Sequence, residues 1–429
     1  MGQPKKIRFR ARSIHPAWFI LAICFVNIFI NYGIRLGYSV VLPEMLKSFH
    51  IGRRQAGDIF NAYLFAYFII SPFTGHLTDR FGARRVIPFF GILLGSGTLL
   101  MGTSNSLLSA SLSFALVGAG ASAMWIPVLT VIQRWFSETR RGLALGILSS
   151  GTGLGFAVMG SLHPLIIEAW GWRFSWYLPG MAALCMVAVN ALMLRSSPED
   201  SGLHPWSEGD RCGARGSARH EYSRGSGKYT SILKSGNFWT VGLSYFFITI
   251  ALYTITTFMV DYAHNSLHLS FARASLLAPI HGFAQIAGVL SIPILSDFIG
   301  RKRTLMLSNT AIGISALGIL FSRSHWPSLC VSVGVLGIFY GITWPMYGAC
   351  AGDYFEREHI GSVIGAWTPF YGIGAVSAHR IAGHLRDLTG SFTVPFVFAV
   401  ITAFAASTLL LLLRTQSTGC NPPDAIRRI

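Results

Sequence analysis

Residues 75–85 read Gly-His-Leu-Thr-Asp-Arg-Phe-Gly-Ala-Arg-Arg, and residues 293–303 read Pro-Ile-Leu-Ser-Asp-Phe-Ile-Gly-Arg-Lys-Arg. Both are short polar segments between long apolar runs, and their aspartates, Asp79 and Asp297, lie 218 positions apart. Further out, Pro127 is repeated as Pro345 at the same offset. Several matches at one offset indicate a duplicated unit.

The composition indicates a membrane protein. Of the 429 residues, 52% are hydrophobic and 12% are charged, and the mean hydropathy is +0.51. A typical soluble domain carries about 25% charged residues, so this chain cannot cover the surfaces of several soluble domains. The formal net charge of +17 would suggest a nucleic-acid partner in a soluble protein, but the basic residues alternate between loops, as the positive-inside rule expects. We therefore expect no nucleic-acid partner.

The apolar runs predict an all-α fold of twelve transmembrane helices in two six-helix bundles. With both termini on one side, the loops on that side hold 25 lysines and arginines against 7 in the opposite loops. This bias places both termini in the cytoplasm of a multi-pass protein of the cell (inner, cytoplasmic) membrane. The predicted bundles are 1–195 and 237–429, and the Gly- and Ser-rich segment 196–236 is predicted to be a flexible cytoplasmic linker. The predicted spans are about 17–42, 57–74, 86–104, 108–133, 142–167, 174–195, 237–262, 271–295, 304–322, 327–351, 361–384 and 393–413.

The segment 75–85 resembles the loop 2–3 signature of the major facilitator superfamily. The resemblance extends over nearly the whole chain, and it implies two parallel six-helix repeats with the substrate site at the midplane. It also implies that this loop locks the ends of the two halves, so that breaking its ion pair shifts the conformational equilibrium. The alternative is that the arginines only set the topology. The implied gating residues are Gly75, Asp79, Arg80, Gly82 and Arg84 in the first copy and Asp297, Gly300 and Arg301 in the second.

Arg35 lies within the first predicted span. An arginine at a helix centre costs roughly 2.5–3.5 kcal/mol on insertion scales, unless it faces a cavity or a partner. Its planar guanidinium suits a carboxylate or a phosphate. We expect Arg35 to bind a substrate anion, with Tyr32 and Tyr38 as polar neighbours. The alternative is an arginine that reaches the membrane interface or pairs with an internal acid.

Two branches of the superfamily are similar to different parts of the chain. The run 35–40 resembles the organic anion:cation symporters, in which this arginine is implied to bind the substrate carboxylate. Segments 134–146, 197–205 and 383–390 resemble the monocarboxylate and oxalate:formate transporters. Those branches often carry a substrate arginine in helix 8, where this chain has Gly288. Arg380 in the eleventh span is the expected replacement, and the alternative is an arginine at the outer interface.

Aromatic residues in several spans are expected to line the cavity and to contact an apolar part of the substrate; packing between helices is the alternative. The candidates are Tyr253, Trp344 and Tyr371. For proton coupling, the candidates within spans are His281 and His163, because histidine is the side chain whose unperturbed pKa lies near physiological pH; the alternative for each is a satisfied hydrogen-bonding residue. Asp58 and Asp261 lie near the outer ends of their predicted helices. The two interpretations are that they accept the coupled proton or that they are solvated residues at helix ends.

These observations predict a secondary transporter of small organic anions, most simply carboxylates, which works by alternating access as a proton symporter or an anion exchanger. Proton-coupled efflux of drugs or other amphiphiles, and a non-transporting sensor, are the alternatives. The helix-5 ending that is typical of drug antiporters is missing, and a positive cavity would repel cations. No motif of an enzyme, cofactor or metal site is found, so we expect a protein that is not an enzyme and needs no cofactor. We also expect it to be a monomer in the lipid bilayer.

Overall fold

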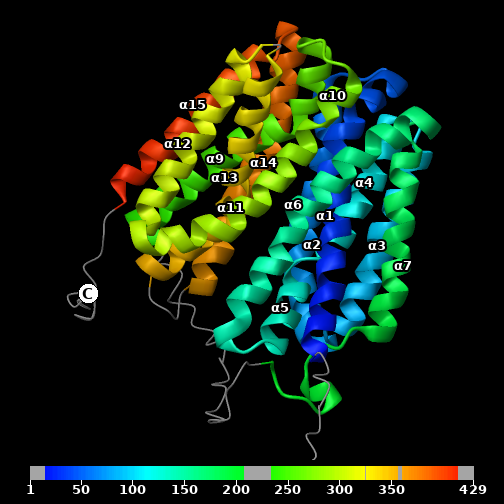
Figure 1. The fold of residues 1–429 in the computed structure, drawn as a ribbon, viewed down its shortest axis with the longest axis vertical. Coiled ribbons are helices and arrows are strands. Elements are labelled where there is room, and N and C mark those ends of the chain that lie inside the picture. Colours follow the sequence, from blue (N-terminus) through cyan, green and yellow to red (C-terminus); the bar gives the residue numbers. More distant parts are fainter. Residues whose placement is uncertain (1–14, 207–232, 324, 356–359, 414–429) are drawn as a thin grey trace, which may run out of the picture. The chain divides into compact units, whose positions relative to one another are not determined.

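The computed structural model describes residues 15–206, 233–323, 325–355 and 360–413. In these ranges β structure is limited to one isolated bridge, between Phe136 and Trp206, and the rest is helices and their connections (Figure 1). The α-helices are α1 (Pro16–Phe49), α2 (Arg53–Phe81), α3 (Ala83–Thr103), α4 (Leu107–Ala121), α5 (Ile126–Trp135), α6 (Glu138–Trp170), α7 (Phe174–Met193), α9 (Gly236–Asp261), α10 (Phe271–Ser275), α11 (Leu277–Ile299), α12 (Arg301–Phe321), α13 (Trp326–Tyr354), α14 (Ile360–Thr389) and α15 (Thr393–Leu409). The 3-10 helices are η1 (Glu199–Ser201) and η4 (Leu410–Leu412), and η2 (Tyr262–Ser266) is a π-helix.

The helices confirm the predicted all-α membrane fold. Among the described residues, ten segments are long and apolar enough to cross a membrane by length and composition, and one of them, Leu107–Trp135, joins α4 and α5. The two remaining spans are α2 and α14, of 29 and 30 residues, which carry more polar side chains. At 1.5 Å per residue both are longer than the ~30 Å hydrocarbon core. The twelve spans are therefore all present as helices.

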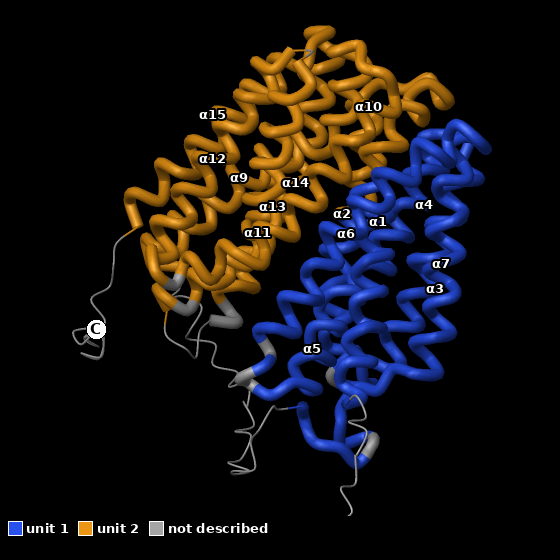
Figure 2. The backbone as a smooth tube through the Cα atoms, in the orientation of Figure 1, with its two compact units in different colours: residues 1–37, 65–217 blue, residues 38–64, 218–429 orange. Residues whose placement is uncertain are grey.

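The chain divides into two compact units (Figure 2). Unit 1 contains residues 1–37 and 65–217, and unit 2 contains residues 38–64 and 218–429. Residues 38–64, which we call the hairpin tip, are the end of α1, the turn and the start of α2, and they pack within unit 2. The predicted halves 1–195 and 237–429 therefore do not coincide with the two compact units. That each half forms one six-helix bundle in the membrane remains a prediction.

The start of the predicted flexible linker is folded onto unit 1. The backbone N–H of Trp206 donates to Trp135 O at 2.9 Å, and Ser137 N–H donates to Trp206 O at 3.1 Å. The indole of Trp206 packs edge-on against Trp18 at 5.0 Å and against Phe136 at 5.8 Å. The rest of the linker, 207–232, lies outside the described residues.

Gly288 brings α11 against α13. A Cβ at this position would meet the carbonyl oxygen of Ile338 on α13. At this position, where the sequence resemblance implies an arginine, the backbones of α11 and α13 approach each other closely. Only glycine permits this approach.

Replacing Gly288 with alanine should lower the stability of the protein, because the added methyl forces α13 to shift. Overpacking of this kind costs about 1–3 kcal/mol. Gly348→Ala on α13 is the matched control, since nothing lies within 4 Å of a Cβ added there. Thermal unfolding in detergent compares the two variants, and equal stability would contradict the close packing of α11 and α13.

Candidate functional site

Arg35 lies inside unit 1 against aromatic rings. Its side chain is on α1 and is 5% exposed. The guanidinium carbon is 5.7 Å from the ring centre of Tyr32 and 5.8 Å from that of Tyr67 on α2. Tyr32 in turn packs edge-on against Trp125 at 6.3 Å. Aromatic faces stabilise a guanidinium by cation–π attraction.

The glycines around Arg35 bring α1 close to α6. A Cβ on Gly33 would meet the side chain of Met159 and the carbonyl of Gly155, and a Cβ on Gly37 would meet Nε2 of His163. His163 is 1% exposed, and neither ring nitrogen has a hydrogen-bond partner within the described residues. This predicted proton-coupling candidate on α6 therefore lies beside Gly37, which is two residues along α1 from Arg35.

Three predicted substrate-contacting aromatics meet in unit 2. The hydroxyls of Tyr253 and Tyr371 lie 2.6 Å apart, and the Tyr371 ring is edge-on to Trp344 at 5.6 Å. Tyr245, which the sequence analysis did not select, packs against Tyr371 at 5.2 Å and stacks on Tyr347 at 4.5 Å. The cluster joins α9, α13 and α14. Tyr38 packs edge-on against Phe60 at 5.3 Å, and its hydroxyl donates to Ala56 O at 2.7 Å.

Arg380 and His379 lie on different faces of α14. The side chain of Arg380 is 60% exposed and lies 3.9 Å from Asp58. It lines a shallow hollow with Arg54, Ile381, His384 and Leu385. His379, in contrast, is fully buried. Neighbouring side chains on a helix point about 100° apart, so the two residues do not face the same surroundings, and tertiary packing determines which one is buried.

His379 is held by hydrogen bonds from two other helices. Its Nδ1 lies 3.0 Å from Oδ1 of Asn61 on α2, and its Nε2 lies 2.9 Å from the hydroxyl of Thr257 on α9. The ring packs against Phe60 at 4.5 Å and Tyr253 at 5.3 Å. A Cβ at Gly57 would contact the backbone of His379, so glycine allows α2 to approach α14 this closely.

A neutral cluster of four charges holds the hairpin tip. Arg53 pairs with the fully buried Asp261 through two hydrogen bonds, Nε to Oδ2 at 2.9 Å and Nη2 to Oδ1 at 3.2 Å. The carboxylate of Asp387 accepts the first backbone N–H groups of α2, from Arg53 at 3.0 Å and Arg54 at 2.9 Å. Arg386 interacts electrostatically with Arg53, Asp261 and Asp387. Asp387 thus caps a helix that is distant in sequence.

The two loop signatures adopt the same local structure. Gly82 and Gly300 precede α3 and α12 with φ of 79° and 91°, a backbone conformation that favours glycine. Arg84 approaches the carbonyl of Ala191 near the end of α7 at 3.5 Å. Its repeat partner Lys302 donates to Leu413 O, beyond α15, at 2.8 Å. Both basic residues therefore bind the C-terminal end of the sixth helix in their own unit, where cations are favourable.

The other predicted gating residues have separate surroundings. Arg301 pairs with Asp353 at 3.3 Å. The guanidinium of Arg80 lies 5.2 Å from the Phe81 ring, and nothing lies within 4 Å of a Cβ added at Gly75. The side chains of Asp79 and Asp297 lie outside the described part of the structure. Their role as a gate remains a prediction.

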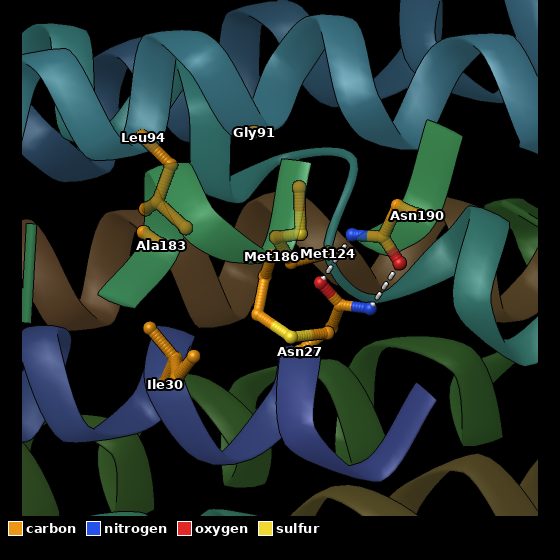
Figure 3. A pocket seen from close by; sticks show the side chains of 8 residues that line it. All are labelled: Asn27, Ile30, Gly91, Leu94, Met124, Ala183, Met186 and Asn190. Carbon is orange, nitrogen blue, oxygen red and sulfur yellow. Dashed lines mark hydrogen bonds between the residues drawn. The ribbon is translucent and has the colours of Figure 1, made fainter. Parts of the chain in front are cut away.

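Unit 1 also contains a small cavity between α1, α3 and α7 (Figure 3). Its volume is about 10 Å³, which is space for about one water molecule. Asn27 and Asn190 border it and exchange two hydrogen bonds of 2.8 Å. The pair satisfies its own amides, so this cavity is a packing feature and not a substrate site.

His281, the remaining histidine candidate, is buried and packs edge-on against Tyr340 at 5.0 Å.

Comparison with known proteins gives the family. The sequence profile of the Major Facilitator Superfamily matches residues 24–293 and 241–426. The chain belongs to this superfamily, and it is a multi-pass membrane transporter by fold and family.

Several curated relatives are similar over most of their length. The chain is 24% identical to a probable hexose phosphate transport protein of Chlamydia pneumoniae, over 91% of this chain and 89% of that protein. It is 26% identical to monocarboxylate transporter 13 of Rattus norvegicus (92% and 88%). It is 22% identical to a probable sulfoacetate transporter of Cupriavidus necator (89% and 90%).

A solved structure shares the fold. It is a bacterial homologue of the human lysosomal transporter Spinster, in an inward-facing and unoccupied conformation, with a TM-score of 0.71 at 14% sequence identity. The match covers 94% of this chain and all of that chain.

Proposed function

We propose that this protein is a secondary transporter of small organic anions, with carboxylates as the first candidates. The observation that carries the proposal is Arg35, a nearly buried guanidinium on α1 whose central carbon lies 5.7 Å from the ring centre of Tyr32 and 5.8 Å from that of Tyr67. A buried arginine is suited to bind a planar anion by two parallel hydrogen bonds.

The names of the relatives support an anionic substrate. They are described as transporters of hexose phosphate, monocarboxylate and sulfoacetate. These solutes differ in size and in acid group, but each carries a negative charge. An arginine that pairs with the acid group is the simplest feature that such a set would share.

The remaining roles follow as parts of the same proposal. The cluster of Tyr253, Trp344 and Tyr371 contacts an apolar portion of the substrate. The loop signatures gate the cycle, and a monomer in the cell membrane, with both termini cytoplasmic, exchanges anions or couples them to protons. A positively charged residue near the substrate makes export of cationic drugs the less favoured activity.

A thermal-shift screen of the purified protein in detergent tests the substrate class. Lactate, sulfoacetate and glucose 6-phosphate should be compared with lactamide and glucose, which lack the acid group. An anion at 100 times its Kd should stabilise the protein by about 2.7 kcal/mol, and the uncharged analogues should not. Stabilisation by amphiphilic cations and by none of the anions would contradict the proposal.

A further inference from the structure

We propose that Asn31 is a second substrate-binding residue, which favours anions that carry a hydroxyl beside the acid group. The inference rests on the proposed function, because it assigns a further contact to the anion that Arg35 binds. Two observations carry it. The amide oxygen of Asn31 is buried without a hydrogen-bond partner among the described residues, and Asn31 lies one helical turn before Arg35.

Asn31 belongs to a row of polar side chains along α1. Asn27, Asn31 and Arg35 follow one another at intervals of four residues, and they are 5%, 3% and 5% exposed. Residues four apart lie one above the other on the same face of a helix. This face of α1 therefore holds two buried amides next to the arginine of the candidate anion site.

The two amides of this row differ in their partners. Asn27 exchanges two hydrogen bonds of 2.8 Å with Asn190 on α7, and it also donates to Ile23 O at 2.9 Å. The Oδ1 atom of Asn31 has no such donor in the part of the chain that the structure describes. Buried polar atoms without a partner are rare, because the hydration they lose is not replaced. A donor from outside the chain would satisfy this oxygen.

The side chain of Arg35 extends toward the turn that contains Asn31. Helical side chains point back toward the preceding turn, and the guanidinium carbon lies 5.7 Å from the ring centre of Tyr32, three residues earlier. Positions three and four residues earlier lie on either side of Arg35 on the helix surface. One small molecule can therefore place its acid group on Arg35 and a neighbouring donor on Asn31.

The chemistry of these two groups defines the donor. An amide oxygen only accepts hydrogen bonds, so the ligand must supply an O–H or an N–H. An ammonium group could donate, but the guanidinium of Arg35 repels a second positive charge. A neutral hydroxyl avoids this repulsion, so the ligand class is hydroxy acids. Both side chains are nearly buried, so the ligand reaches them when the surrounding helices separate.

The first test compares ligands that differ only in the group beside the carboxylate. Glycolate, acetate and glycine carry a hydroxyl, a hydrogen and an ammonium there, and malate, succinate and aspartate form the same series with a second acid group. Dissociation constants come from the concentration dependence of thermal unfolding of the purified full-length protein. The wild type should bind at least one hydroxy acid about five- to tenfold more tightly than its deoxy analogue. The matching amino acid should bind more weakly than the hydroxy acid.

Replacing Asn31 should remove this preference. In Asn31→Leu the ratio of the two affinities should fall to within about twofold, while the affinity for the deoxy analogue stays the same. Asn31→Ala should give the same result without the larger volume of leucine. Equal affinities for both analogues in the wild type, or a ratio that persists in both variants, would overturn the proposal.

The second test needs no ligand and compares thermal unfolding of Asn31→Leu and Asn27→Leu. Asn27→Leu removes two hydrogen bonds and leaves the amide of Asn190 unpaired, so it should lower the unfolding midpoint. Asn31→Leu removes a buried acceptor that has no donor, so its midpoint should equal or exceed that of the wild type. An equal fall in both variants would show that the chain itself satisfies Asn31, which would overturn the proposal.

The outcomes separate this inference from the proposed function. If no anion stabilises the wild type, the proposed function fails, and the assignment of Asn31 fails with it. If sulfoacetate or another anion binds but no hydroxy acid is preferred over its deoxy analogue, only the assignment of Asn31 is overturned.

Discussion

Replacing Arg53 with methionine should destabilise the protein by about 3 kcal/mol, because it leaves the fully buried carboxylate of Asp261 without its guanidinium. Asn265 still donates to Asp261 at 2.6 Å, but one neutral amide cannot replace two charge-assisted bonds. Asp261→Asn should cost less, since Arg53 is 23% exposed and can reach water. Thermal unfolding of the purified variants measures the order of these effects.

The double variant Arg53→Met with Asp261→Leu provides the control. Replacing both members of a buried pair by apolar residues is often neutral, so the double variant should recover most of the stability lost in Arg53→Met. Additive losses in the double variant would contradict the assignment of this pair as the contact that holds the hairpin tip.

Much of the fold could be predicted because its signals are local. Each span is a continuous apolar run, and the repeat places matching glycines at the same point of each unit, Gly82 and Gly300. The prediction that 196–236 is flexible was incomplete for a physical reason. Composition favours flexibility there, whereas one indole, Trp206, holds the start of the segment against Trp18 and Phe136.

The details of the candidate site depend on contacts between distant residues. Arg380 is predicted from the sequence to contact the substrate, and the structure places it at an exposed position beside Asp58. Asn61 and Thr257, which hydrogen-bond to His379, are not among the predicted site residues. Small polar residues are common in spans, so only the tertiary packing identifies this pair. The sequence does show a histidine next to an arginine within a predicted span. It does not show which of the two side chains faces inward.

Arg35→Ala should reduce the affinity for the transported anion by at least about thirtyfold, since removing one partner of a buried charge pair costs about 2–5 kcal/mol. Arg35→Lys keeps the charge but loses the planar pair of donors, so we expect a loss of about tenfold. Arg380→Ala should have a small effect on a monoanion, because this side chain is 60% exposed and lies beside Asp58. A larger effect on a dianion would indicate that Arg380 binds a second acid group.

The most direct measurement is calorimetric titration of purified wild-type and Arg35→Ala protein with the anion that stabilises the wild type most strongly. If Arg35 is the primary anion-binding residue, binding to the folded variant should be lost or weakened by at least about thirtyfold. An affinity within about threefold of the wild type, in a variant whose thermal unfolding is unchanged, would contradict the assignment of Arg35 and with it the central claim.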